Sequence, residues 1–235
     1  MKHLLTLCLL ASTLAGCGDL SKIAGASIPL PVTEADAAEA LRQALDKGVG
    51  RGIATLNKQD GFFGSPVYKL LLPPEAEKIE STLRQVGMGA MVDRAILQIN
   101  RAAEDAVGSA APIFVDAIRS MSIQDALGVV RGGNNAATDY FRQRTREKLV
   151  TAFSPIVRAS LDKFSATKYY GDVVSTYNNF PTTLRKLNPD LPSYVVDRAV
   201  NALFDQIAQE EAAIRANPAA RTTELLKRVF GSVNR

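Results

Sequence analysis

Apolar residues recur every three or four positions along most of this chain, and that spacing constrains the fold more than any other feature. Between Thr33 and Asn57 the repeating positions fall on one side of a helix. They are Ala37, Leu41, Ala44, Leu45, Val49 and Ile53. Because the same period continues almost to the C-terminus, the sequence predicts an all-α protein, a single helical-bundle domain of about eight or nine helices.

Capping residues, glycines and prolines divide this pattern into separate helices. Thr33 with Asp36, and Ser122 with Asp125, have the spacing of helix N-terminal caps. Pro155 is expected to kink or divide the longest helix. The predicted helices are 33–57, 75–86, 89–108, 111–121, 123–131, 135–163, 167–178, 192–216 and 222–230.

Two further features concern the packing around the first helix. Gly48 and Gly52 lie four residues apart on one face, where they let another backbone approach closely. The segment 59–74, QDGFFGSPVYKLLLPP, carries turn signals. Within it, 67–72 is expected to be extended and to pair with 28–32.

The first residues have the organisation of an export signal. Lys2 precedes an apolar stretch, 4–15, which suits a signal peptide and is too short to span a membrane. The next residues, LAGC, are similar to the lipobox of bacterial lipoproteins. The other interpretation is an ordinary secretory signal in which Cys17 occurs by chance.

The lipobox resemblance implies three segments in the precursor. Residues 1–16 would be a cleaved signal peptide, and Cys17 would carry lipid on its sulfur and its amine. Residues 17–32 would then form a lipidated tether that reaches at most about 50 Å, followed by the helical domain, 33–235. By resemblance to lipoprotein sorting in Gram-negative bacteria, Gly18 after the cysteine favours the outer membrane.

Composition excludes several kinds of chemistry. The sole histidine is His3, and the two cysteines are Cys8 and Cys17, so signal cleavage and lipidation would leave neither an imidazole nor a free thiol. Ser-His-Asp hydrolysis, thiolate or histidine metal sites and histidine-ligated haem are therefore excluded. We expect no cofactor, no metal and no catalytic residues. The formal net charge of +4 would fall to about +3 on loss of Lys2 with the signal, which permits contact with anionic headgroups, glycans or lipopolysaccharide, and no nucleic-acid-binding motif is present.

Several polar residues fall on or beside apolar helix faces. Asn100 and Glu104 lie one turn apart on the flank of their helix. Thr138 and Thr145 fall on the apolar face of 135–163. The simpler alternative for Asn100 and Glu104 is that the helix flank is exposed to water. The simpler alternative for Thr138 and Thr145 is that each hydroxyl donates to the backbone carbonyl one turn earlier.

Glu210 lies on the apolar stripe of 192–216. A buried carboxylate needs a cation, hydrogen-bond donors or a proton. We expect Glu210 to pair with Arg221 or Arg215 and so to fix the C-terminal helix. Glu211 points more to the flank, about 100° away, so the two carboxylates do not form an acid/base pair.

The stretch RGGNNAATDYFRQRT, residues 131–145, contains a glycine-rich turn before a helix, an arrangement that often binds phosphate. A corner between helices is the favoured interpretation. Gly132 would end one helix in the left-handed conformation, and Asn134 or Asn135 would cap the next. The weak candidate anion site consists of Arg131, Gly132, Gly133 and Asn134.

Five spaced stretches look familiar together: QDGFFGSPVYKLLLP, INRAAEDAV, IQDALGVVRGGNNAATDYFRQRT, YVVDRAVNALFDQIAQEEAAIRANP and ARTTELLKRVFG. In this order they resemble the bacterial lipoprotein family of the domain of unknown function 4197. The resemblance implies a helical, exported protein and no particular reaction. Its motif positions overlap the polar positions above, which favours one internal polar network. The candidates are Asn100, Glu104, Asp125, Thr138, Thr145, Glu210, Arg215 and Arg221.

We therefore expect a lipid-anchored, non-enzymatic envelope protein facing the periplasm, which acts as a binding or structural module for an envelope protein or the cell wall. The first alternative is a carrier of a lipid or other apolar ligand, with Arg101 or Arg144 at the mouth of a helical cavity. The second is a carboxylate-dependent hydrolase. A closed core would favour the binding or structural module, and an elongated apolar cavity would favour the carrier. Carboxylates that converge on a site open to water would favour the hydrolase.

Overall fold

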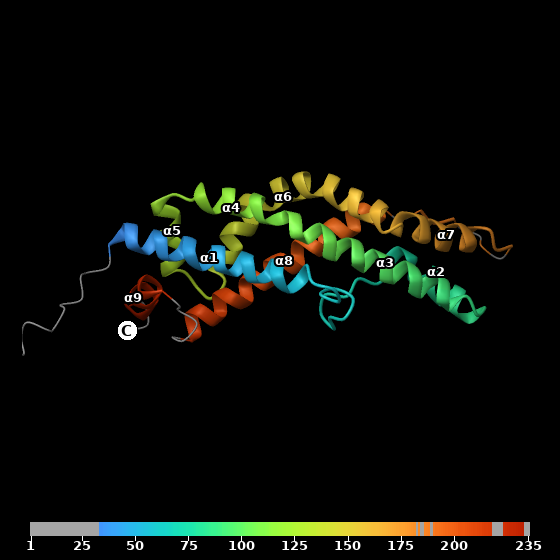
Figure 1. Ribbon diagram of the computed structural model, residues 1–235, viewed down its shortest axis with the longest axis horizontal. Coiled ribbons are helices and arrows are strands. Elements are labelled where there is room, and N and C mark those ends of the chain that lie inside the picture. Colours follow the sequence, from blue (N-terminus) through green and yellow to red (C-terminus); the bar gives the residue numbers. More distant parts are fainter. Residues whose placement is uncertain (1–32, 182, 184–185, 189, 218–222, 233–235) are drawn as a thin grey trace, which may run out of the picture. The chain divides into compact units, whose positions relative to one another are not determined.

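The computed structural model describes residues 33–181, 183, 186–188, 190–217 and 223–232, and within them it contains α-helices and no strand (Figure 1). Single-turn 3-10 helices, η2 (Pro74–Ala76) and η3 (Gly108–Ala110), precede α2 and α4. The α-helices are α1 (Glu34–Leu56), α2 (Glu77–Gln85), α3 (Gly89–Val107), α4 (Ala111–Arg119), α5 (Ile123–Arg131), α6 (Ala136–Lys163), α7 (Ala166–Asn178), α8 (Leu191–Ala216) and α9 (Glu224–Ser232).

The all-α prediction is confirmed, and every predicted helix starts and ends within two residues of an observed one. The two predicted caps are also present. The Thr33 hydroxyl accepts a hydrogen bond from the Asp36 N–H at 3.0 Å, and the Ser122 hydroxyl accepts one from the Asp125 N–H at 3.1 Å. The predicted signal, tether and lipidated Cys17 lie outside the described residues.

Helix α8 packs against both α1 and α6, and these three helices form the centre of the domain (Figure 1). Helix α8 approaches α1 closely where α1 has glycine. A Cβ on Gly52 would lie 2.8 Å from the Cβ of Gln206, and a Cβ on Gly48 would lie 3.4 Å from the Cβ of Glu210. The prediction that these glycines admit a second helix is therefore confirmed.

The remaining helices pack around this centre. α3 lies against α6 and α7, α2 against α3, and α4 and α5 against both α1 and α6, while α9 contacts α1. Phe114 of α4 meets Phe204 of α8 edge to face, with 5.9 Å between the ring centroids. Each helix thus buries the apolar stripe that predicted it.

The structure differs from two expectations about the chain between and within helices. Residues 67–72 form no strand; they belong to an irregular segment, loop 57–73, and their expected partner 28–32 lies outside the described residues. Pro155 lies inside α6, which continues through it, so the expected division is wrong and the expected kink stays a prediction. A proline removes one backbone donor, and packing of α6 against α3 and α8 offsets that loss.

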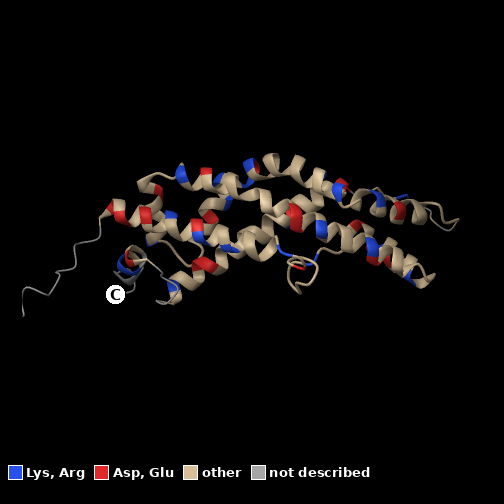
Figure 2. Ribbon diagram, viewed as in Figure 1, with Lys and Arg blue, Asp and Glu red and all other residues tan. Residues whose placement is uncertain are grey.

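Charged residues of both signs are distributed along the helices rather than gathered on one of them (Figure 2). In the described part of the chain, no helix combines the length and the apolar character needed to cross a bilayer.

Candidate functional site

The buried Asn100 of α3 binds loop 57–73 through its side-chain amide. Its Oδ1 accepts a hydrogen bond from the Leu70 N–H at 2.9 Å, and its Nδ2 donates to the carbonyls of Leu70 and Ile96, both at 2.7 Å. The side chain is 0% exposed, so these bonds replace all contact with water. Both amide donors and the acceptor are used, which fixes the end of the loop nearest α2.

Glu104, one turn further along α3, binds the beginning of the same loop. One carboxylate oxygen accepts the consecutive N–H groups of Phe62 and Phe63, each at 3.1 Å. The other accepts from Arg101 at 2.7 Å, and Arg101 also binds Asp60 at 2.8 Å. The polar flank predicted on this helix is therefore not solvated; it holds a loop in place.

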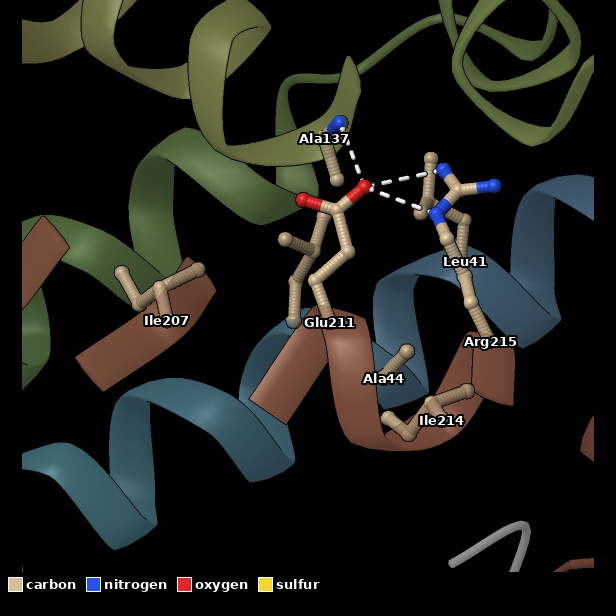
Figure 3. A pocket seen from close by; sticks show the side chains of 8 residues that line it. Leu41, Ala44, Ala137, Ile207, Glu211, Ile214 and Arg215 are labelled. Atoms are coloured by element: carbon tan, nitrogen blue, oxygen red, sulfur yellow. Dashed lines mark hydrogen bonds and ion pairs between the residues drawn. The ribbon is translucent and has the colours of Figure 1, made fainter. Parts of the chain in front are cut away.

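Glu211 of α8 performs a similar task at the start of α6 (Figure 3). Its carboxylate accepts from the N–H of Ala137 at 3.0 Å, the N–H of Thr138 at 2.9 Å and the Thr138 hydroxyl at 2.8 Å. Asn135, the residue at the N-cap position, makes no capping bond with its side chain. Because the first N–H groups of a helix lack partners inside it, Glu211 acts as the cap of α6 from a distant helix.

Arg215, one turn after Glu211 on α8, completes this arrangement (Figure 3). Its Nε and Nη2 donate to Glu211 Oε1 at 3.0 and 2.8 Å. Nη2 also donates to the Val129 carbonyl at 3.0 Å, and Nη1 to the Gly132 carbonyl at 3.4 Å. The pair Glu211–Arg215 thus joins the end of α5 to the start of α6.

These contacts correct the predicted corner in detail. Gly132 is extended, with φ −78° and ψ 177°, and not left-handed. The Gly132 N–H still donates to the Val129 carbonyl at 3.1 Å, and Arg215 adds side-chain donors to the carbonyls of Val129 and Gly132. Neither Asn134 nor Asn135 caps α6, because Glu211 occupies that position. The proposed anion-site residues are all exposed: Arg131, Gly132, Gly133 and Asn134.

Glu210 pairs with an arginine, but of the two expected partners Arg215 is not the one that binds it. Both of its carboxylate oxygens accept from Arg51 Nη1 at 2.6 Å, and Lys47 lies 3.4 Å away. Arg215 instead binds Glu211, four residues before it, because the two share a face of α8. Arg221, the other expected partner, lies outside the described residues.

The other network candidates act separately. The Thr145 hydroxyl donates to the Phe141 carbonyl at 2.6 Å, which is the simpler alternative given for it. Asp125 accepts from the Ser122 hydroxyl at 2.7 Å and lies 3.8 Å from Arg144. The candidates therefore form several small clusters rather than one network. Sequence reasoning missed Glu211 as the cap of α6, although the i, i+4 spacing of Glu211 and Arg215 indicated their pairing.

The described residues line several spaces, among them a small one in the packing of the central helices and a larger surface groove. The internal space lies between α1, α6 and α8 beside Glu211 (Figure 3), and its volume of about 10 Å³ is roughly what one water needs. The groove lies between α4 and α6, over the start of α5, and measures about 550 Å³. The groove, unlike the internal space, has the volume of a ligand site.

The buried carboxylates are not placed for catalysis or metal binding. Glu104, Glu210 and Glu211 are at most 9% exposed, and each is engaged by arginine or backbone donors. Among the described residues, no group of three or more His, Cys, Asp or Glu side chains is arranged to hold a metal ion. These carboxylates act as structural acceptors that position loops and helix ends.

Fold and site together define a class: an α-helical domain whose buried acid–arginine clusters fix a long loop and an interhelical corner. The chain belongs to the family described as protein of unknown function (DUF4197), whose model matches residues 31–231. This match confirms the resemblance of the five motifs. No curated protein and no solved structure is similar enough to this chain to match it.

Proposed function

We propose that this protein is a lipid-anchored envelope protein that binds a partner rather than catalysing a reaction. The LAGC sequence supports attachment through Cys17, and Gly18 supports an outer-membrane location facing the periplasm. The observation that carries the proposal is loop 57–73, a long irregular segment that is firmly held and presents apolar side chains to solvent.

Two exposed apolar side chains of this loop are unusual for an irregular segment. Val67 is 67% exposed and Leu71 is 53% exposed. Loops are normally polar, and irregular loops of this length usually have a function. Asn100 and Glu104 hold the base, and the Tyr68 hydroxyl accepts from Gln206 and Gln209 of α8 at 3.0 and 2.9 Å. A surface fixed in advance loses little conformational entropy on binding.

The charges beside Val67 and Leu71 favour a protein partner with an apolar site edged by carboxylates. Lys58 and Lys69 are exposed. Lys69 lies 4.3 Å above the centre of the Phe63 ring, whereas the nearby Asp60 is neutralised by Arg101.

Site-specific photo-crosslinking in living cells tests the docking role. A photoreactive residue at Val67 is expected to give a discrete adduct with one envelope protein, and Leu71→Asp should abolish it. Val86, at the end of α2, is 55% exposed and serves as the matched control position. The purified partner should bind the wild type at least about tenfold more tightly than Leu71→Asp, a difference of roughly 1.4 kcal/mol. Equal adducts at both positions, or none at Val67, would contradict the proposal.

The anchor has an independent test. Cys17→Ser is expected to release the protein from the membrane fraction and to prevent incorporation of labelled palmitate, because several acyl chains on one residue provide the attachment. A variant that remains in membranes with undiminished label would show that Cys17 is not the anchor.

The carrier alternative receives less support from the core. The internal space beside Glu211 has room for about one water, not for an acyl chain. The closed packing of α1, α6 and α8 there favours the interaction module.

A further inference from the structure

The groove between α4 and α6 lies apart from loop 57–73 and carries charges of both signs. Asp116 of α4 and Asp125 of α5 contribute two carboxylates, and Arg144 and Lys148 of α6 contribute two cations. The formal charge of these four side chains sums to zero, so the groove does not favour a ligand of a single sign.

One end of the groove has partners within the protein. Asp125 accepts from the Ser122 hydroxyl at 2.7 Å. Arg144 lies 3.8 Å from Asp125 and 5.6 Å from the centre of the Tyr140 ring.

The remaining two charges are not used within the protein. In the part of the chain that the structure describes, neither the Asp116 carboxylate nor the Lys148 ammonium makes a hydrogen bond or an ion pair. They come from different helices and line the same groove, with the buried Phe141 and the partly buried Ile113 also in the lining. A ligand that enters the groove therefore meets one free anion, one free cation and an apolar surface.

We propose that this groove binds a short peptide with both a free amine and a free carboxylate. Asp116 binds the ammonium group, Lys148 binds the carboxylate, and the partly buried Ile113 contacts a side chain of the peptide. A volume of about 550 Å³ lies within the range of small-ligand sites. Such a peptide has two sources in the envelope, the stem peptides of the cell wall and fragments of degraded proteins.

Calorimetry with the mature lipidated protein in detergent tests this site. The probes are L-Ala–γ-D-Glu–meso-diaminopimelate–D-Ala and L-Ala–L-Leu–L-Ala, each free, N-acetylated or C-terminally amidated. Both free peptides are expected to bind, and capping either end of the Leu peptide should weaken binding about tenfold. The source is the one whose free peptide binds more tightly.

Matched variants assign each end of the peptide to one residue. In Asp116→Asn, acetylation of the peptide's amine should no longer weaken binding, while amidation of its carboxylate still should. In Lys148→Gln, amidation should no longer weaken binding, while acetylation still should. Asp46→Asn on α1 and Lys78→Gln on α2 remove exposed charges outside the groove and should leave all affinities unchanged.

Two results would overturn the proposal. The first is no binding of either free peptide up to about 5 mM, which corresponds to an affinity too weak to matter. The second is binding whose sensitivity to capping is the same in both variants as in the wild type. Neither result bears on the crosslinking at Val67, because that experiment uses a different surface and a different partner.

Discussion

The helices α5 and α6 follow each other in the chain, and their N-termini are capped in opposite ways. At α5 the cap is local: Asp125 N–H donates to the Ser122 hydroxyl at 3.1 Å, and the Asp125 carboxylate binds back to Ser122. At α6 the cap is Glu211, which lies 73 residues after Thr138. The first turn of α5 is therefore encoded by its own residues, whereas the first turn of α6 depends on α8 being in place.

Removal of the remote cap is expected to have the largest effect. Glu211→Ala leaves the N–H groups of Ala137 and Thr138 without acceptors and Arg215 without its carboxylate. Breaking a buried pair of this kind costs about 3–5 kcal/mol, which for a domain of this size lowers the Tm by roughly 10 °C. Thermal unfolding measures the loss of stability. Relative to the wild type, hydrogen exchange should increase most at the amides of Ala137 and Thr138.

Glu210→Ala is the matched control, because Glu210 and Glu211 are adjacent and are 9% and 8% exposed. Glu210 binds only side chains: Arg51, whose side chain is 56% exposed, forms the closer ion pair, and Lys47 lies 3.4 Å away. An ion pair so open to water contributes about 1 kcal/mol or less. Equal losses of stability in the two variants would contradict the distinction between a helix cap and an ion pair.

Loss of the arginine should have a smaller effect than loss of the glutamate. Arg215→Met removes the donors to the Val129 and Gly132 carbonyls, but Glu211 keeps its three donors from α6. We expect a loss of about 2 kcal/mol, typical of hydrogen bonds to a charged group, with exchange increased at the end of α5. Arg51→Met provides the control. A loss in Arg215→Met as large as that in Glu211→Ala would mean that the ion pair, not the cap, stabilises α6.

The contrast between a local cap and a remote cap also explains which parts of the structure the sequence predicts. The caps Thr33–Asp36 and Ser122–Asp125 involve residues three apart, so local spacing identifies them. The close packing at Gly48 and Gly52 follows from their common face. These features, like the helix boundaries, depend on the periodicity of a single helix.

The partners of the buried polar residues depend on which elements meet, and periodicity does not determine that. A helical pattern places Glu210 and Glu211 about 100° apart, but only the packing of α8 between α1 and α6 gives them different partners. Likewise, the position of Asn100 on a helix flank is predictable, whereas its binding to the backbone of Leu70 requires the path of loop 57–73.

Removal of the local cap is expected to cost less than removal of the remote one. Ser122→Ala removes one capping hydroxyl at an exposed helix end, for which the usual loss is about 1 kcal/mol. Exchange should increase in the first turn of α5 and remain unchanged at Ala137 and Thr138. Thr33→Ala removes the equivalent hydroxyl from α1 and should cost a similar amount. Faster exchange at the start of α6 in Ser122→Ala would show that the two helix ends are not independent.

The smallest effect concerns the charge within the local cap, and it depends on pH. The pKa of Asp125 is lowered mainly by the hydrogen bond from the Ser122 hydroxyl and further by that from the Tyr140 hydroxyl. A group whose folded-state pKa is depressed adds stability above its unfolded pKa, about 3.9 for aspartate, and that stability is lost as the pH falls through the folded value.

Asp125→Asn should therefore lower the Tm slightly at pH 6, and the difference from the wild type should shrink below about pH 4 as the wild-type carboxylate takes up a proton. Asp46→Asn, at an exposed position of α1, controls for the change in net charge. Thermal unfolding between about pH 6 and pH 2 measures both variants across the window that the lowered pKa defines. A Tm difference that stays constant over this range would mean that the shape of the Asp125 side chain, and not its charge, stabilises the start of α5.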